Sequence, residues 1–153
     1  MARINQGDRA PDFTVKTHSG ESVTLSDLLR ENVVVLFFYP KDGTSVCTAE
    51  ACAFRDAYAD FVKAGTAVIG ISADDEASHN TFAAQHQLPY HLISDTDGSL
   101  RKAFGVPKTL GLLPGRVTYV IDQAGVVRLV FQAALGSESH VREALAMVKE
   151  LKG

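Results

Sequence analysis

Two uninterrupted apolar segments constrain the fold of this chain more than any other feature. VVVLFFY occupies positions 33–39 and TAVIGIS occupies positions 66–72, and both are rich in β-branched or aromatic residues. Continuous apolar runs of this length are typical of strands that are buried on both faces of a sheet. Apolar residues at helical spacing lie between the two runs, so the sequence predicts a strand–helix–strand crossover.

The same alternation continues to the end of the chain. Acidic residues open a predicted helix at 74–87, and Gln-Ala-Gly at 123–125 separates two strand-like segments that form a hairpin. The fold class is therefore α/β, with a mostly parallel sheet covered by helices and antiparallel strands added late. The expected elements are an edge strand or hairpin to about residue 17, a helical turn at 26–29, strands at 33–39, 66–72 and 90–93, helices at 44–63, 74–87, 99–104 and 137–152, a loop at 107–115, and hairpin strands at 116–121 and 126–133.

Composition limits the kinds of binding partner and the cellular locations that suit this chain. The 153 residues are 46% hydrophobic and 22% charged, which suits one globular domain spanning 1–153. A net charge of −3 argues against a nucleic-acid partner or an anionic membrane surface. The longest apolar run is too short to cross a bilayer, and the first residues lack the apolar core of a signal peptide. We expect a cytoplasmic location, although a trimmed transit peptide is left open.

The two cysteines of the chain, Cys47 and Cys52, lie five residues apart at the start of the predicted helix 44–63. This helix follows the buried strand 33–39, and in open α/β sheets chemistry collects at the carboxyl ends of such strands. In a reducing compartment a cysteine pair is more often reactive than a structural disulfide. The alternative is that both are small buried core residues.

The position of Cys47 favours the reactive interpretation. A helix N-terminus offers unpaired N–H groups and a partial positive charge, which stabilise a thiolate. Cys52 lies one and a half turns further along and gains much less, so the two thiols are chemically unequal. Thr44 is either the N-cap or a hydroxyl directed at the sulfur, and Pro40 is either a strand terminator or a cap that keeps water off the sulfur.

The remaining charged side chains of this region indicate a functional role less clearly. Glu50 and Arg55 fit charges on the surface of a helix, but an acid beside Cys47 disfavours the thiolate, so a compensating cation is expected. No ligand pattern for a metal is present. The histidines are expected on turns and helix surfaces; they are His18, His79, His86, His91 and His140.

The residues Pro40, Thr44 and Cys47 spell P-x-x-x-T-x-x-C, which resembles the active-site motif of the peroxiredoxins. The surrounding FYPKDGTSVCTAEACAFRD is similar to the bacterioferritin-comigratory or peroxiredoxin Q group, in which a second cysteine follows five residues after the first. The similarity extends to GDRAPDFTV, LISDTDGSLRKAFGV and LPGRVTYVIDQAGVV. Ser45 and Val46 replace the Pro-Gly that this group often carries, which could alter how easily the segment unwinds.

The resemblance implies a thioredoxin-like fold with a central mixed sheet flanked by helices and an N-terminal extra strand or hairpin. It also implies a thiol peroxidase without metal, haem or flavin, in which Cys47 is oxidised by a hydroperoxide, Cys52 forms the disulfide, and thioredoxin or a similar dithiol reduces it. Arg116 would face the sulfur. Thr44 and the backbone N–H groups near Val46 and Cys47 would stabilise developing charge. Pro40, Val46 and Glu50 are expected around the substrate, in a monomer or weak homodimer.

The spacing of the cysteines then predicts a conformational change. In an intact α-helix, Cα atoms five residues apart are roughly 8.6 Å from one another, beyond the ~7 Å that a disulfide tolerates. If both cysteines occupy one helix, that helix must unwind from about 44 to 54 after oxidation.

Two other functions remain open at this point. One is a dithiol–disulfide oxidoreductase or isomerase acting on protein thiols, and the other is a non-enzymatic redox-sensing or binding module. The apolar side chains Phe38, Tyr39 and Phe54 could form a wall for alkyl peroxides, but we expect them in the core.

Overall fold

A five-stranded mixed sheet forms the centre of the computed structural model, which describes residues 4–106, 108–109, 113–114, 116–133 and 137–152. The strand order is β5-β4-β3-β8-β9. Strands β3, β4 and β5 run parallel, whereas β8 pairs antiparallel with β3 and with β9. This arrangement confirms the late hairpin and the mixed sheet that the resemblance implies, although the sheet is not mostly parallel, because two of its four strand pairs are antiparallel. The bounds are β3 (Val33–Phe38), β4 (Thr66–Ser72), β5 (His91–Ser94), β8 (Val117–Ile121) and β9 (Val127–Gln132).

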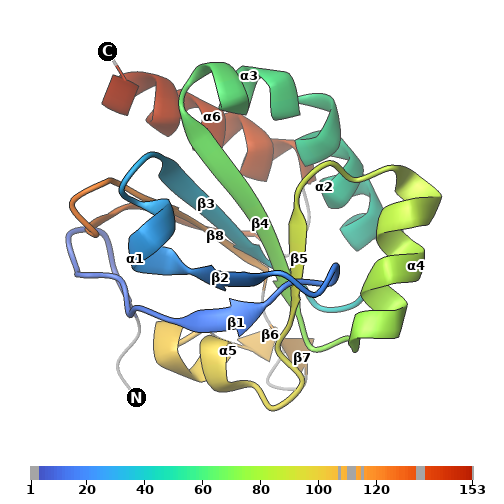
Figure 1. Ribbon diagram of the computed structural model, residues 1–153. Helices are drawn as coiled ribbons and strands as arrows, with labels where there is room; N and C mark the ends of the chain where they lie inside the picture. Colours follow the sequence, from blue (N-terminus) through green and yellow to red (C-terminus); the bar gives the residue numbers. More distant parts are fainter. Residues whose placement is uncertain (1–3, 107, 110–112, 115, 134–136, 153) are drawn as a thin grey trace.

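Helices cover both faces of this sheet, which explains why its central strands are apolar throughout. Along β3, Val35 and Phe37 enter a core formed with α2, α3, α4 and α6. Leu36 and Phe38 enter a second core, formed with α1 and α5. Figure 1 shows these two groups of helices on opposite sides of the sheet. The helices are α1 (Leu25–Leu28), α2 (Ser45–Asp56), α3 (Tyr58–Lys63), α4 (Glu76–His86), α5 (Ser99–Phe104) and α6 (Ser137–Lys152).

The aromatic residues near the cysteines belong to these cores, as expected. Phe38, Tyr39 and Phe54 are each at most 1% exposed. Phe54 stacks on Phe37 with 4.4 Å between the ring centres. Burial of one such side chain stabilises the fold by about 1.5–3 kcal/mol, so Phe54 ties α2 firmly to the sheet.

The prediction of one continuous helix over 44–63 is wrong. The chain leaves the helical conformation at Ala57, where α2 ends and α3 begins. Phe54 and Phe61 enter the same core on either side of this break, with ring centres 5.8 Å apart. Helical spacing of apolar residues across the break hid it from the sequence pattern.

Two short hairpins accompany the central sheet. The predicted N-terminal edge strand is one arm of a hairpin in which β1 (Thr14–Lys16) pairs antiparallel with β2 (Ser22–Thr24). The segment 107–115 was expected to be a loop, but β6 (Lys108–Thr109) pairs with β7 (Leu113–Pro114). The rest of that segment lies outside the described residues. Within the described ranges, no helix is long and apolar enough to cross a membrane.

Candidate active site

The connection from β3 to α2 carries the first cysteine. After Tyr39 the chain turns through Gly43, whose φ of 80° is a conformation that glycine adopts without strain. Thr44 is extended at the N-cap position, and α2 begins at Ser45. Cys47 is therefore in the first turn of α2, where the backbone N–H groups have no helical partners, and it is 1% exposed. The sulfur is therefore buried at a helix N-terminus.

Arg116 reaches this sulfur from a distant part of the sequence. Because Val117 of β8 pairs with Phe38 of β3, Arg116 lies at the end of β3 where the chain continues toward α2. Its Nη2 donates a hydrogen bond to Cys47 Sγ at 3.2 Å, and its side chain is nearly fully buried. The antiparallel pairing of β3 and β8 thus places a guanidinium against the thiol.

Glu50 completes this group, and its predicted position on the helix surface is wrong. It lies three residues after Cys47 on the same side of α2 and is 0% exposed. Arg116 Nη1 donates to Glu50 Oε1 at 2.6 Å. Burial raises the pKa of the Glu50 carboxyl to about 7, although Arg116 opposes this shift. One buried guanidinium is therefore shared between a thiol and a carboxyl group.

Thr44, Pro40 and Val46 surround Cys47 along the chain. The Thr44 hydroxyl donates to the backbone oxygen of Lys41 at 3.0 Å, and its side chain makes no capping bond to the first turn. In this conformation the hydroxyl proton is directed at Lys41, and the capping role considered from the sequence is not filled. Pro40 and Val46 are half-buried.

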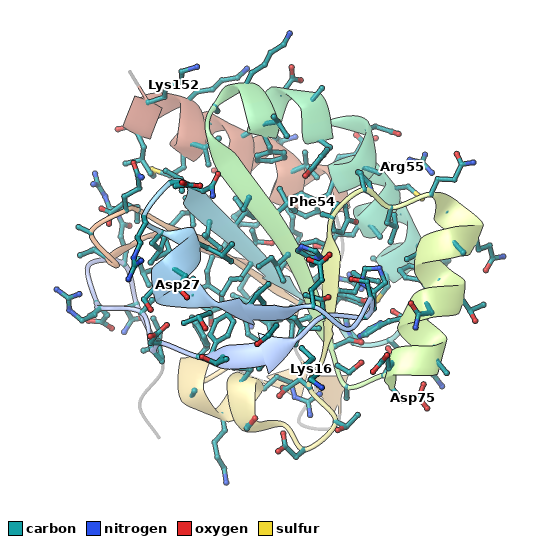
Figure 2. All side chains as sticks on the ribbon, in the orientation of Figure 1. Lys16, Asp27, Phe54, Arg55, Asp75 and Lys152 are labelled. Carbon is teal, nitrogen blue, oxygen red and sulfur yellow. The ribbon has the colours of Figure 1, made fainter. Side chains whose placement is uncertain are left out.

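Cys52 lies in α2 as well, half-buried and unpaired. Two contacts hold this part of the helix to its neighbours. The Tyr90 hydroxyl donates to the backbone oxygen of Ala51 at 2.7 Å, and Arg55 Nη1 donates to the backbone oxygen of His86 at 2.8 Å. Figure 2 shows Phe54 inside the molecule and Arg55 near α4. Since both cysteines occupy one helix, the Cα separation of roughly 8.6 Å prevents a disulfide while α2 is intact.

A buried polar network fixes the other side of the β3–α2 connection, and it contains a histidine whose predicted exposure is wrong. His79 of α4 is 0% exposed. Its Nδ1 lies 2.7 Å from Asp42 Oδ2, and its Nε2 lies 3.0 Å from the backbone oxygen of Ile93. The Tyr39 hydroxyl donates to Asp42 Oδ1 at 2.6 Å. Although burial opposes it, these hydrogen bonds lower the pKa of Asp42, so the connection is held by a charged carboxylate.

The same network contains the group of described side chains with a geometry suited to a metal ion. Ligand atoms of Asp42, Asp74 and His79 lie within 4.8 Å of one another. Asp42 and His79 are hydrogen-bonded to each other, however, and Asp74 Oδ2 accepts hydrogen bonds from the Asp42 backbone N–H and from Ser72. These partners account for the position of each side chain in the cluster.

His140 of α6 is a second histidine that the sequence wrongly placed on a surface. It is 0% exposed, with Nδ1 2.8 Å from Thr118 Oγ1 and Nε2 2.9 Å from the backbone oxygen of Ala133. Its Nδ1 also lies 3.5 Å from Glu50 Oε2. The buried group therefore extends from Cys47 through Arg116 and Glu50 to His140.

A buried cysteine in the first turn of a helix, contacted by an arginine on a thioredoxin-like sheet, defines a class of cysteine-based peroxidases. The sequence matches the AhpC/TSA family over residues 6–130. The chain belongs to this family and, within it, to the peroxiredoxin Q group of thiol-dependent peroxidases.

Individual relatives agree with this assignment. Chloroplastic peroxiredoxin Q of Arabidopsis thaliana is 50% identical over 150 residues, covering 97% of this chain and 69% of the relative. The crystal structure of peroxidoxin BcpB from Mycobacterium tuberculosis superposes with a TM-score of 0.91 at 35% identity, covering 99% and 100% of the two chains. A structure of the Xanthomonas campestris bacterioferritin comigratory protein, studied for alkyl peroxide reduction, gives a TM-score of 0.83 at 28% identity over 92% of each chain.

Proposed function

We propose that this protein reduces hydrogen peroxide and organic hydroperoxides with Cys47 as the nucleophile. The observation that carries the proposal is the hydrogen bond from Arg116 to the buried Cys47 sulfur. The thiolate attacks one peroxide oxygen, the O–O bond breaks, and water or an alcohol leaves after taking up a proton. The sulfur becomes a sulfenic acid, the first step of cysteine oxidation.

Arg116 and the first turn of α2 stabilise the charge that develops in this step. The guanidinium and the N–H groups of Val46 and Cys47 act as preorganised donors for the leaving oxygen. Thr44 joins them if its hydroxyl turns from Lys41 toward the substrate. Pro40 and Val46 line the approach to the sulfur, and Glu50, which is fully buried, acts through Arg116.

The second half of the cycle uses Cys52. Its thiol condenses with the sulfenic acid, releasing water and forming the Cys47–Cys52 disulfide. Because an intact α2 keeps the two residues apart, the helix unwinds before the disulfide forms. Unwinding breaks the hydrogen bonds from Tyr90 to the backbone of Ala51 and from Arg55 to the backbone of His86. Unwinding also carries the disulfide toward the surface, where thioredoxin or a similar dithiol protein reduces it to two thiols.

We further propose a cytoplasmic protein that acts as one domain over 1–153, as a monomer or weak homodimer. Val62, at 53% exposed, is the one large exposed apolar side chain among the described residues, and a single such side chain offers no extended apolar surface for a strong dimer. Two cysteines that act as reactive thiols suit a reducing compartment.

A coupled assay with thioredoxin, its reductase and a peroxide tests the function directly. Catalytic peroxide consumption is the expected result. Turnover of insulin disulfides without peroxide consumption would identify a protein dithiol–disulfide oxidoreductase instead. Oxidation that stops after one equivalent would identify a redox sensor.

The Cys52→Ser variant is expected to separate the two half-reactions. It should form one sulfenic acid per chain at the normal rate, because Cys47 and Arg116 are unchanged, but lose turnover with thioredoxin. Mass spectrometry after sulfenic-acid trapping measures the first effect, and the coupled assay measures the second. Substantial thioredoxin-linked turnover would show that Cys52 is not the resolving thiol.

A further inference from the structure

The carboxyl group of Glu50 has one oxygen that the arginine does not use. Oε1 accepts a hydrogen bond from Arg116, but among the described residues nothing donates to Oε2, which is fully buried. A buried carboxylate oxygen without a donor bears the full cost of desolvation, which is larger for a charged group than for a neutral one. A proton on Oε2 removes most of this cost.

The hydrogen bonds of His140 determine which form of its Nδ1 atom lies next to Glu50 Oε2. The backbone oxygen of Ala133 can only accept, so His140 Nε2 carries a hydrogen. In the neutral ring Nδ1 is then unprotonated and accepts a hydrogen bond from the Thr118 hydroxyl. Glu50 Oε2, 3.5 Å away, thus faces a nitrogen lone pair rather than a donor. Such a neighbour favours the protonated carboxyl group over the carboxylate.

We propose that Glu50 holds a proton on Oε2 in the working enzyme, and that His140 keeps it there by presenting an unprotonated Nδ1. Both are positioning residues for the peroxide step that the proposed function assigns to Cys47, and the inference rests on that function. A neutral Glu50 still accepts a hydrogen bond from Arg116 but does not neutralise it. The charge of the guanidinium is then available to the Cys47 thiolate and to the leaving oxygen.

The charged and titratable neighbours of Glu50 are consistent with this arrangement. Arg116 faces it from the start of β8, His140 from α6, and Tyr90 from beside β5. Burial lowers the pKa of His140, and the charge of Arg116 adds to this, so the ring is neutral at neutral pH. Burial raises the pKa of Tyr90 well above its usual value, so it remains an uncharged phenol.

The pH dependence of the peroxide step follows from the increase in the pKa of Glu50 on folding. Its folded-state pKa is raised from 4.5 to about 7, so the protonated form prevails below about pH 7 and the carboxylate above it. As the pH rises through this range, Glu50 becomes an anion and competes with the thiolate for Arg116. The rate of the peroxide step per thiolate is therefore expected to fall across it.

The test combines a spectroscopic and a kinetic measurement on the 153-residue chain. The infrared difference between wild type and Glu50→Gln, recorded well below pH 7, should contain the C=O band of one protonated carboxyl group, and this band should disappear above pH 7. Carboxylate bands alone below pH 7 would overturn the inference, whether or not the protein reduces peroxides.

The kinetic arm follows Cys47 oxidation by peroxide across the neutral range. In Glu50→Gln the amide is neutral at every pH, so the inflection near pH 7 should vanish and the rate above pH 7 should exceed wild type by roughly three- to tenfold. In His140→Gln an amide N–H can turn to Oε2 and stabilise the anion, so the inflection should move to lower pH. The control His86→Gln alters a half-buried histidine on α4 and should match wild type.

The infrared and kinetic measurements distinguish a failure of the proposed role of Glu50 from a failure of the proposed peroxidase function. Normal reaction with peroxide but identical profiles in wild type and Glu50→Gln would refute the role of Glu50 and leave the peroxidase intact. Absence of any reaction of wild-type Cys47 with peroxide would refute the proposed function itself.

Discussion

Replacement of Cys47 by serine is expected to abolish peroxide reduction. Enzymes that lose their nucleophile lose activity on the order of 10⁶-fold, and this chain has one other thiol, Cys52, whose Cα lies roughly 8.6 Å from that of Cys47 in α2. That thiol is not in the first turn of the helix, so it lacks the unpaired N–H groups that surround Cys47. The measurements are thioredoxin-coupled peroxide consumption and the rate of thiol oxidation by peroxide.

Cys52→Ser is the matched control for this substitution, since it also exchanges one thiol of α2 for a hydroxyl group. It should oxidise once at the normal rate, whereas Cys47→Ser should not oxidise measurably. A residual rate for Cys47→Ser within about tenfold of wild type would mean that another group attacks the peroxide. The free energy of unfolding of both variants shows whether the fold is retained.

Replacement of Arg116 by alanine is expected to slow the peroxide step by roughly a hundredfold, or about 3 kcal/mol, the loss typical of one oxyanion donor. The guanidinium contacts the sulfur directly and is the cation placed to stabilise both the thiolate and the leaving oxygen. Arg116→Lys should recover only part of this rate, because an ammonium group cannot contact Cys47 and Glu50 with a planar fork. Stopped-flow measurement of the second-order rate constant for peroxide checks both variants.

Arg128→Ala provides a control for the loss of an arginine as such. Arg128 is 43% exposed and pairs with Asp122 at 3.3 Å on β9, so its removal should leave the peroxide step unchanged. If Arg116→Ala reacts with peroxide as fast as Arg128→Ala does, Arg116 has no part in the reaction. Loss of the buried cation also leaves Glu50 unpaired, so the unfolding free energy should be measured alongside.

The strands and the position of Cys47 could be predicted from the sequence because they depend on local signals. The runs at 33–39 and 66–72 are continuous and β-branched, and the structure places β3 and β4 there. The thiol follows the first run directly. These features need no knowledge of which strands pair.

The contacts of Arg116 and His140 could not be derived from local patterns. Arg116 meets Cys47 across 69 positions because β8 pairs antiparallel with β3, and His140 arrives on the last helix. The resemblance to peroxiredoxins supplied Arg116 as the cation that offsets Glu50, but not the nearby histidine. Only the three-dimensional arrangement brings these three side chains together.

Glu50 and His79 were wrongly assigned to surfaces because charged and polar residues on helices are usually exposed. A signal was present in each case. Glu50 falls on the buried side of α2 with Cys47 and Phe54, and His79 precedes the buried Phe82 by three residues on α4. A polar residue on the apolar side of a helix is a candidate for a buried network.

We expect Cys47 and Cys52 to form a disulfide for which α2 must unwind, and the proposed catalytic cycle depends on this step. Amide hydrogen exchange on the dithiol and disulfide forms, with the disulfide verified by mass spectrometry, tests it most directly. Oxidation should remove protection from residues 44–54 while β3 and β4 stay protected, because the intact helix keeps the two Cα atoms roughly 8.6 Å apart. Equal protection of residues 44–54 in both forms would contradict the account.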